Sequence, residues 1–331
     1  MIRSANHSSY PKIANNPLDQ GLRVVLRRHA RGAATAEELV NAQDEVTTVA
    51  VAEQSRAFLE IVTDGMVRWN GPLSHLATGL DGLVPRELMR WFDTNFYDRR
   101  IEVAGEIRRR GPFLVHDWEV AQGVAPKKLV KAVLPGPVTF ARLARDRHYG
   151  SRDKLAGALA SALAAEVADL AAAGARVFQL DEPLLCRHPE DLELVRLTGG
   201  EVFAAAGAGA VTIVSTYFGD LGPLAARWSE LPGTHLGLDL TAGGTPLERL
   251  AELPPGRGVY LGLFDARRLS AEYVEDVAAE LEPYRAVLQS RDVIVGPNAG
   301  LELLPRDQAF DKLLQARYLA EKLSQEWTWA S

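Results

Sequence analysis

The chain is poor in cysteine and has no long apolar run. Its single cysteine, Cys186, excludes an intramolecular disulfide framework and leaves no cysteine cluster for a structural zinc. No apolar run approaches the ~20 residues needed to cross a bilayer. The polar start, MIRSANHSSYPK, lacks the apolar core of a secretion signal. These absences predict a cytoplasmic protein that does not engage a membrane.

A basic excess is also missing. The net charge of −6 argues against a general nucleic-acid binder, which needs positive charge to neutralise phosphates. Local basic groups admit two interpretations, a solvated surface or a site for the anionic tail of a ligand. These groups are Arg99 with Arg100, the three arginines at 108–110, and Lys127, Lys128 and Lys131.

What the chain has in quantity is apolar residues, 47% of the total, arranged in a recurring pattern of strand, turn and helix. Several strand candidates are apolar on both faces, as in a covered parallel sheet. Eight such units predict one (β/α)8 barrel over residues 1–331. A doubly wound open sheet is the alternative, but no G-x-G-x-x-G follows an early strand. The expected strands are 8–13, 58–65, 129–137, 175–183, 210–216, 234–240, 258–265 and 292–298.

Helices are marked by apolar residues at helical spacing. Leu155, Leu159, Leu163 and Leu170 predict a helix that ends at the cap residue Gly174. Two segments break the rhythm of the barrel. Residues 14–57 read as a long helical stretch, and residues 84–126 as an insertion with a small antiparallel pair beside the barrel mouth.

Polar residues follow nearly every predicted strand at its carboxyl end, where barrels of this type carry their catalytic groups. A single Asp in such a place commonly caps the next helix, so the whole set counts for more than any member. It comprises Ser9, Tyr10, Lys12, Asp64, Thr139, Asp181, Glu182, Ser215, Thr216, Tyr217, Asp239, Asp265 and Asn298.

The stretch VFQLDEPLLCRHP, residues 177–189, gathers two carboxylates, the cysteine and a histidine. Asp181 with Glu182 fits either a helix cap or a carboxylate that binds an ammonium or accepts a proton. Cys186 fits a small buried hydrophobe. Together with His188 it also fits half of a metal site, whose other ligands would come from Asp181, Glu182 or His116.

In order along the chain, several stretches resemble the cobalamin-independent methionine synthases in their single-barrel form. RWFDTN and TYFGD look most like the amino-terminal barrel of the two-barrel enzymes, whereas the NAGL stretch looks more like the catalytic barrel. The matching stretches are SYPKI, VTDGMVRW, RWFDTNFY, VLPGPVTFARL, FQLDEPLL, STYFGD and VGPNAGLELLP.

The resemblance implies methyl transfer from 5-methyltetrahydrofolate to the thiol of homocysteine, which zinc holds as the nucleophilic thiolate. The family's zinc ligands do not carry over. Ser215-Thr216-Tyr217 stands for His-x-Cys, Asp239 for Glu, and Asn298-Ala299-Gly300 for Asp-Cys-Gly. Serine, tyrosine and alanine do not replace an imidazole and two thiolates. Zinc is therefore not expected.

The amino-acid contacts of the family carry over in part. Asp181 matches the carboxylate that meets the substrate ammonium, and Ser9 matches the serine of the family's Ser-Phe/Tyr-Pro turn. The family's Gly-Glu pair is missing, because Gly65 is followed by Met66; the adjacent Asp64 is a substitute from a different strand face.

We accordingly predict three groups of site residues. The catalytic group supplies general-base help, the second binds substrate, and the third binds 5-methyltetrahydrofolate as methyl donor, with aromatic rings available to stack on its pterin. The groups are Asp181, His116 and Asp239; Ser9, Lys12, Asp64, Thr139, Glu182, Ser215, Tyr217 and Asn298; and Trp91, Asp93 and Asn95.

Three functions remain open. The first is folate-linked methyl transfer to an acceptor that needs no zinc, such as an amine or a pre-ionised group. The second is a non-catalytic barrel that holds folate or docks on a catalytic partner subunit. The third is a conventional zinc methionine synthase, which the single cysteine disfavours.

Overall fold

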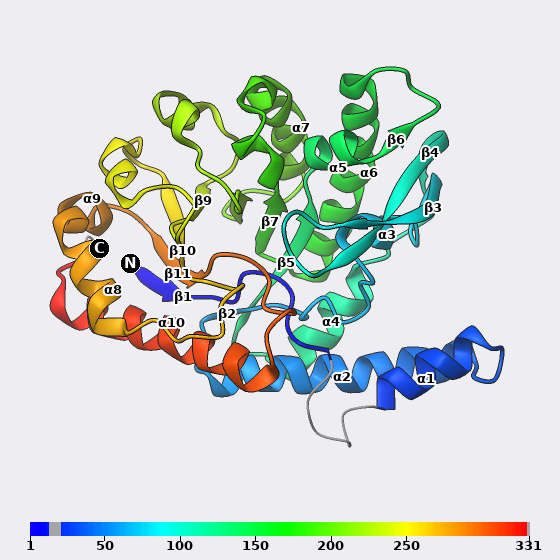
Figure 1. Ribbon diagram of the computed structural model, residues 1–331, viewed down its shortest axis with the longest axis horizontal. Coiled ribbons are helices and arrows are strands. Elements are labelled where there is room, and N and C mark those ends of the chain that lie inside the picture. The colour runs from blue at the N-terminus through cyan, green and yellow to red at the C-terminus, as the bar shows by residue number, and fades with distance from the viewer. Residues whose placement is uncertain (13–20, 330–331) are drawn as a thin grey trace.

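The computed structural model describes residues 1–12 and 21–329, and its centre is a ring of parallel strands (Figure 1). A bridge between Ala5 and Ile61 closes the ring. The predicted (β/α)8 barrel is confirmed. Around the barrel the strands are β1 (Ile2–Ser4), β11 (Val293–Pro297), β10 (Gly258–Phe264), β9 (His235–Asp239), β8 (Val211–Ser215), β7 (Val177–Asp181), β5 (Leu129–Pro135) and β2 (Ile61–Val62).

Seven of the eight expected strands coincide with barrel strands, and the first does not. The segment 8–13 was expected to be a strand, but β1 precedes it, and residues 8–12 form an irregular stretch at the carboxyl end of β1. Ile13 lies outside the described residues. Pro11 donates no ladder hydrogen bond, which suits a turn rather than a central strand. The correction places Ser8 and Ser9 at the barrel mouth.

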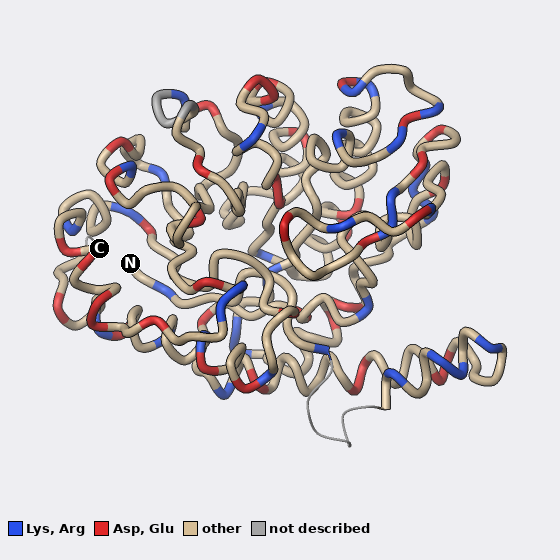
Figure 2. Tube along the Cα trace, in the orientation of Figure 1, with Lys and Arg blue, Asp and Glu red and all other residues tan. Residues whose placement is uncertain are grey.

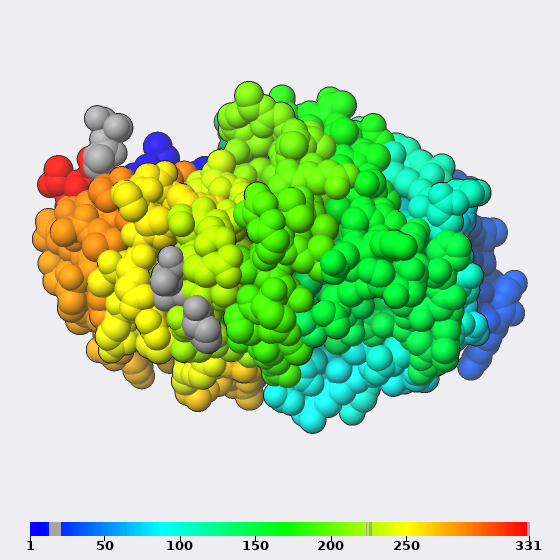
Figure 3. Space-filling view, turned by 90° about the horizontal axis from the view of Figure 1, so that it is seen from above, coloured from blue at the N-terminus to red at the C-terminus, as the bar shows by residue number. Residues whose placement is uncertain are grey.

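Helices cover the outside of the barrel (Figure 1), and in the space-filling view from above, successive parts of the chain lie side by side from green through yellow to orange (Figure 3). 3-10 helices at Gly222–Glu230 and Leu247–Glu252 follow β8 and β9, where the repeat leads one to expect α-helices. The other outer helices are α4 (Val115–Val124), α5 (Pro137–Leu143), α6 (Arg152–Ala173), α7 (Leu192–Ala204), α8 (Val274–Leu281), α9 (Arg285–Gln289) and α10 (Arg306–Glu326).

The predicted helix ending at Gly174 is α6, and its leucines are buried. Gly174 adopts φ 117°, the left-handed conformation that suits a glycine cap. Among the described helices, α6 is the one long and apolar enough by composition to match a membrane span, and half of that window is buried within the fold. A core helix passes the same test.

The amino-terminal helical segment is a hairpin of α1 (Gly21–Ala30) and α2 (Ala36–Arg56), which extends past the barrel (Figure 1). Thr35 and Glu38 begin α2 with a capping box, in which each side chain accepts from the other residue's backbone N–H. The part of the expected helical stretch that covers residues 14–20 lies outside the described residues.

The expected antiparallel pair is the long hairpin of β3 (Leu80–Arg90) and β4 (Tyr97–Arg109), joined by the short β6 (Arg145–Asp146). It begins earlier than residue 84, and the end of the expected insertion forms α4 instead. The carboxylate of Asp98 fixes the hairpin by accepting from Leu73 N (2.7 Å) and Ser74 Oγ (2.6 Å), at the start of α3 (Pro72–Leu76).

The basic groups of the sequence separate in the structure. Charges of both signs alternate along the hairpin (Figure 2), where Arg109 pairs with Glu166 and Asp169, and Arg110 with Asp81. The charges of these two arginines are therefore already balanced by acidic partners. Lys131 is not on the surface at all, since only 1% of it is exposed inside the barrel.

The barrel interior has an apolar layer and a polar layer. The polar layer contains Lys131 and Gln179, and the Lys131 ammonium donates to the Gln179 oxygen and lies 4.9 Å from the centre of the Tyr260 ring. Burial lowers the pKa of Lys131 to about 7, against a smaller opposing effect of Asp181. The apolar layer consists of Ala5, Ile61, Val177, Ile213, Tyr260 and Ile294.

The start of α5 is held by Glu182, which follows β7. Its carboxylate accepts from Val138 N (2.9 Å) and Thr139 N (2.7 Å), two of the backbone donors that a helix start leaves free. The carboxylate reaches them because residue 136 has no side chain: a Cβ on Gly136 would lie 2.1 Å from the Glu182 carboxyl carbon.

We expect Gly136→Ala to lower the free energy of unfolding by roughly 1–3 kcal/mol, the usual cost of overpacking. Gly157→Ala is the control, because a Cβ there meets open space within α6 and should stabilise by about 0.5–1 kcal/mol. Urea unfolding of both variants measures the difference. Equal stability of the two variants would contradict the role assigned to Glu182.

A second expectation concerns Lys131. Between pH 7 and the ordinary lysine value of 10.5, the unfolded chain holds a proton that folded Lys131 has released. The free energy of unfolding therefore gains a rising contribution with pH in this window, at most about 1.4 kcal/mol per pH unit. Lys131→Met removes that contribution, which urea unfolding at several pH values will reveal. Lys127→Met, at an exposed position, should keep the wild-type slope.

Candidate functional site

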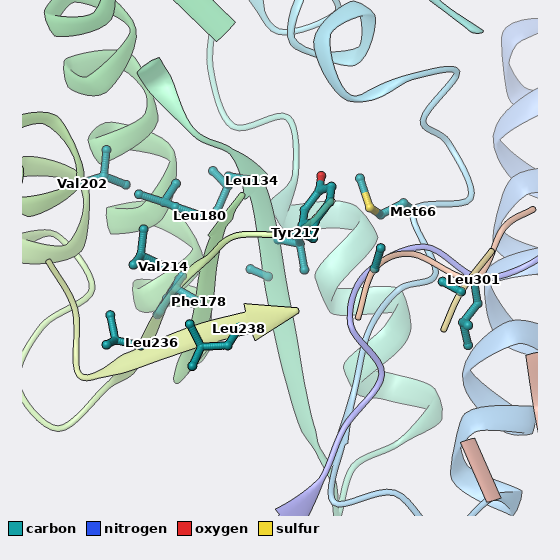
Figure 4. Close-up of a cluster of buried hydrophobic side chains, with 14 of the residues drawn as sticks. Met66, Leu134, Phe178, Leu180, Val202, Val214, Tyr217, Leu236, Leu238 and Leu301 are labelled. Atoms are coloured by element: carbon teal, nitrogen blue, oxygen red, sulfur yellow. The ribbon is translucent and has the colours of Figure 1, made fainter. Parts of the chain in front are cut away.

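A cavity opens at the carboxyl ends of the strands, with roughly 520 Å³ of unfilled space that includes open solvent. In Figure 4, Met66 and Tyr217 lie close together here, apart from the aliphatic cluster around Leu180 and Val214. The barrel strands, the hairpin and the loop after β11 all contribute. The lining residues are Ser8, Ser9, Met66, Trp69, Gly71, Pro72, Trp91, Thr94, Phe96, Asp181, Tyr217, Phe218, Ala299, Gly300, Glu302 and Leu303.

Asp181 is the carboxylate that β7 brings to this cavity. Gln179 Nε2 donates to its Oδ1 (2.7 Å), and the Tyr217 hydroxyl lies 3.5 Å from its Oδ2. Burial raises its pKa to about 7, against the opposing effects of Gln179, Lys131 and Tyr217. An acid with this pKa gives up or accepts a proton near neutrality, as a general base requires.

A chain of hydrogen bonds leads from Lys131 to the cavity. Lys131 Nζ donates to the Gln179 oxygen, and the amide nitrogen faces Asp181 and His7 Nε2 (3.3 Å). Burial, with a smaller contribution from Lys131, lowers the pKa of His7 well below its ordinary value, so the ring is neutral. With Nε2 accepting, the ring hydrogen lies on Nδ1 and donates to Ser8 Oγ (2.9 Å).

Ser215, predicted to bind substrate, faces inward at the end of β8 and not into the cavity. Its hydroxyl lies 2.9 Å from His7 Nε2, and only 1% of the residue is exposed. In the family that the chain resembles, the zinc-binding histidine stands at this position. An imidazole is present here, but it belongs to His7, in the segment that follows β1.

The donor set at these strand ends does not fit zinc, because hydroxyls and a methyl group stand where imidazole and thiolates are needed. Among the described residues, no three His, Cys, Asp or Glu side chains are grouped as metal ligands. Cys186 packs behind the cavity wall, and burial raises the pKa of its thiol to about 12. Zinc-independent chemistry remains a prediction.

Asp239 and Asn298 tie neighbouring strand ends together. The Asp239 carboxylate accepts from Phe218 N (3.0 Å), Thr241 N (3.0 Å) and Oγ1 (2.7 Å), and Asn298 Nδ2 (3.0 Å). Asn298 also accepts from Ala266 N (2.9 Å). Neither residue lines the cavity. Their contacts hold the loop that carries Tyr217 and Phe218.

Asp64, predicted to bind substrate, lines a separate small cavity beside β5 together with Asp117. Burial raises the pKa of Asp64, and burial followed by the charge of Asp64 raises the pKa of Asp117 to about 8. Arg68 forms an ion pair with Asp117 (2.9 Å). The structure therefore does not bring Asp64 beside Asp181 in the mouth cavity.

The other predicted residues lie behind the cavity wall or away from it. Lys12 donates to the Trp69 carbonyl, Thr139 belongs to the start of α5, and Glu182 is committed to that helix. His116 is exposed on α4 and contacts Asp44 (3.2 Å) on α2. Ser9 and Tyr217 do line the mouth cavity with Asp181.

The loop between β3 and β4 forms one wall of the cavity. Trp91 lines it, as predicted for a folate contact, but Asn95 is exposed and Asp93 has 87% of its side chain exposed. The residues between them, Thr94 and Phe96, face the cavity instead. Side chains along this loop alternate between the cavity and solvent, and that alternation distinguishes Thr94 and Phe96 from Asp93 and Asn95.

Backbone strain gathers at this mouth. Met66 (φ 50°), Phe92 (φ 50°) and Phe218 (φ 60°) adopt left-handed conformations that cost non-glycine residues free energy and concentrate at functional sites. Phe92 and Phe218 lie 5.7 Å apart between ring centres. Arg187 stacks on Phe92 (5.3 Å) and Arg267 on Phe218 (4.9 Å).

Glu302 is a cavity carboxylate that the sequence reasoning missed. It follows β11 in the NAGLELLP stretch and lines the cavity with Ser9, and burial raises its pKa against the opposing charge of Lys12. Its position two residues beyond Gly300 was the available signal. His7, Ser8 and Lys131 were also missed, because their neighbours come from distant strands.

Comparisons with known proteins agree with this architecture. The sequence profile described as "Cobalamin-independent synthase, N-terminal domain" matches residues 63–290. A methionine synthase of Saccharolobus solfataricus is 27% identical over 91% of this chain and 90% of its own length, and one of Sulfurisphaera tokodaii is 27% identical over 91% and 88%.

Solved structures share the fold. A B12-independent methionine synthase from Shewanella, solved with selenomethionine, superposes with a TM-score of 0.80 at 21% identity, covering 98% of both chains. A methyltransferase from Methanosarcina mazei gives 0.63 at 13% identity, covering 96% of this chain and 94% of its own. The family profile covers more than half of this chain. The chain therefore belongs to the cobalamin-independent synthase family.

Proposed function

We propose that this protein is a methyltransferase that takes a methyl group from 5-methyltetrahydrofolate and passes it to an acceptor other than zinc-bound homocysteine. The observation that carries the proposal is Asp181, a carboxylate with a pKa of about 7 that faces an aromatic-walled cavity in a barrel of this family. Asp181 retains the family's substrate-binding position, whereas the zinc-binding residue types are absent.

An acceptor with its own lone pair needs a base rather than a metal. Asp181 takes the proton that the acceptor loses. The new bond between the methyl carbon and the acceptor forms as the bond to the folate nitrogen breaks, and a proton returns to that nitrogen. Atoms and charge balance without a redox partner. A well-placed general base contributes roughly 10²–10⁴-fold to the rate.

The chain's own residues fit a folate at this mouth. Trp91 and Phe96 offer flat faces for the pterin ring. The folate supplies the methyl group when bound. Its glutamate tail would extend outward to the rim, where the guanidinium groups of Arg187 and Arg267 are positioned on aromatic rings. We therefore assign the anionic tail of the ligand to these two arginines and not to the basic clusters that the sequence suggested.

Asp239 and His116 stay catalytic predictions with less support than Asp181. Asp239 already accepts four hydrogen bonds, which use the lone pairs a base would need. His116 faces solvent beside Asp44. The proposal therefore assigns the base role to Asp181 alone.

A second candidate function is a non-catalytic barrel that binds folate or docks on a catalytic partner. The observation in its favour is that the matching family profile describes an amino-terminal domain. A stable complex with a second protein, together with no turnover by the chain alone, would support it. Stoichiometric zinc in the purified protein would instead revive the conventional enzyme, the activity that the archaeal relatives' names state.

The first test is a calorimetric titration with 5-methyltetrahydrofolate triglutamate. We expect saturable binding, because the aromatic wall and the rim arginines remain in place. Arg187→Gln should weaken binding of the triglutamate more than binding of the monoglutamate, since the rim contacts the tail. Absence of binding at millimolar ligand would overturn the methyltransferase proposal.

We further expect Asp181→Asn to lower the rate of methyl transfer by at least roughly 10²-fold, because the amide cannot accept the proton. Release of tetrahydrofolate in the presence of candidate amines measures the rate, and circular dichroism checks the fold. Glu201→Gln, which changes an exposed carboxylate on α7, is the matched control. Full activity of Asp181→Asn would refute the base role.

A further inference from the structure

The mouth cavity presents negative charge and no positive side chain. Asp181 and Glu302 are the carboxylates among its lining residues, and neither lysine nor arginine is among them. Lys12 and Lys131 do not line the cavity: Lys12 donates to the Trp69 carbonyl and Lys131 to Gln179, although the charge of Lys12 lowers the pKa of Glu302 and that of Lys131 lowers the pKa of Asp181. A ligand in the cavity therefore meets the two carboxylates directly.

Asp181, Glu302 and Tyr217 line the same cavity, and the Tyr217 hydroxyl lies 3.5 Å from Asp181 Oδ2. Burial raises the pKa of the Tyr217 phenol well above the ordinary value, and the charges of Asp181 and then Glu302 raise it further. Asp181 comes from the end of β7 and Glu302 from the loop after β11, so they approach the Tyr217 ring from different elements. A cation in this cavity therefore faces carboxylates from two elements.

The walls suit an organic cation as well as the charges do. Trp69, Trp91, Phe96 and Phe218 line the cavity, with Met66 in the place where the resembling family carries a glutamate. Aromatic faces attract ammonium groups, most strongly when these are methylated and weakly hydrated. Apolar walls also favour a cation that has few water molecules to lose.

A carboxylate-bearing amino acid fits this lining poorly. The side-chain donors among the lining residues are the hydroxyls of Ser8, Ser9, Thr94 and Tyr217 and the indole nitrogens of Trp69 and Trp91, none of which carries a positive charge. Of these, Thr94 already donates to the Trp91 carbonyl (2.6 Å). The negative pair would repel the carboxylate of a zwitterion.

We propose that the cavity binds an organic cation without a carboxylate, an amine or methylated ammonium compound, between Asp181 and Glu302 and against the aromatic wall. Met66 stands where the family carries its second carboxylate, and Glu302 supplies a carboxylate to the cavity instead. The inference rests on the proposed function, because it names the class of methyl acceptor or methylated product. Its test measures binding alone.

The experiment titrates the full chain with choline and with 3,3-dimethylbutan-1-ol, a neutral compound of the same shape. Quenching of tryptophan fluorescence reports binding, since Trp69 and Trp91 line the cavity. We expect choline to bind at least about tenfold more tightly than the alcohol and than L-methionine. Equal affinity for choline and the alcohol, or tighter binding of methionine, would overturn the proposal.

Variants locate the site. Glu302→Gln and Asp181→Asn should each weaken choline binding about tenfold and leave binding of the neutral alcohol unchanged, whereas Glu248→Gln, on the exposed surface, should change neither. Unchanged choline affinity in Glu302→Gln would refute its role. Thermal melting confirms that each variant is folded.

The outcomes separate the two proposals. Choline binding with no methyl transfer to any amine would refute the proposed function and support the cation site. Methyl transfer to a neutral or zwitterionic acceptor, with no preference for choline over the alcohol, would support the proposed function and refute the cation site.

Discussion

The hydrogen bond from the Lys131 ammonium to the Gln179 oxygen sets the polarity of the whole barrel mouth. A side-chain amide can be rotated either way, and two partners set it here: protonated Lys131 offers only donors, and the ionised Asp181 carboxylate offers only acceptors. With the oxygen committed to Lys131, the amide nitrogen serves Asp181 and His7. The tautomer of His7 and the direction of its bond to Ser8 follow. A lysine beneath the cavity thereby determines which groups at the surface accept and which donate.

The carboxylates of the barrel divide by how many donors they already have. Glu182 and Asp239 accept two and four hydrogen bonds within the fold, and these contacts hold α5 and the loop after β8. Asp181 and Glu302 retain free lone pairs toward the cavity. The same residue type thus serves as scaffold in two places and as a ligand contact in two others.

Local patterns in the sequence predicted the fold well, because an apolar run and a glycine cap act within one element. Seven strands and the helix ending at Gly174 could be found this way. The first strand could not, since the three residues Ile2–Ser4 carry no pattern and SSYPKI looks more strand-like. Local context alone did not identify this short strand.

The site was only partly predictable, because its contacts join residues far apart in the chain. Asp181, Ser9, Tyr217 and Trp91 were found through strand ends and family motifs. Glu302 shares the cavity with Ser9, almost the full chain length away, and His7 meets Ser215 from the opposite side of the barrel. Nothing in one sequence states that such pairs touch. Conversely, Asp64 follows β2, which a bridge joins to the chain after β1, and still faces a different cavity from Ser9.

The hairpin of β3 and β4 gives this protein a wall that can change separately from its barrel. Its ladder is internal apart from the short β6 pairing, and Asp98, beside the tip loop, fastens it to α3. Substitutions at its tip therefore reshape one side of the cavity without disturbing any barrel strand. Selection can alter which molecule is accepted through a few tip residues, while the strands that hold Asp181 stay under separate constraint.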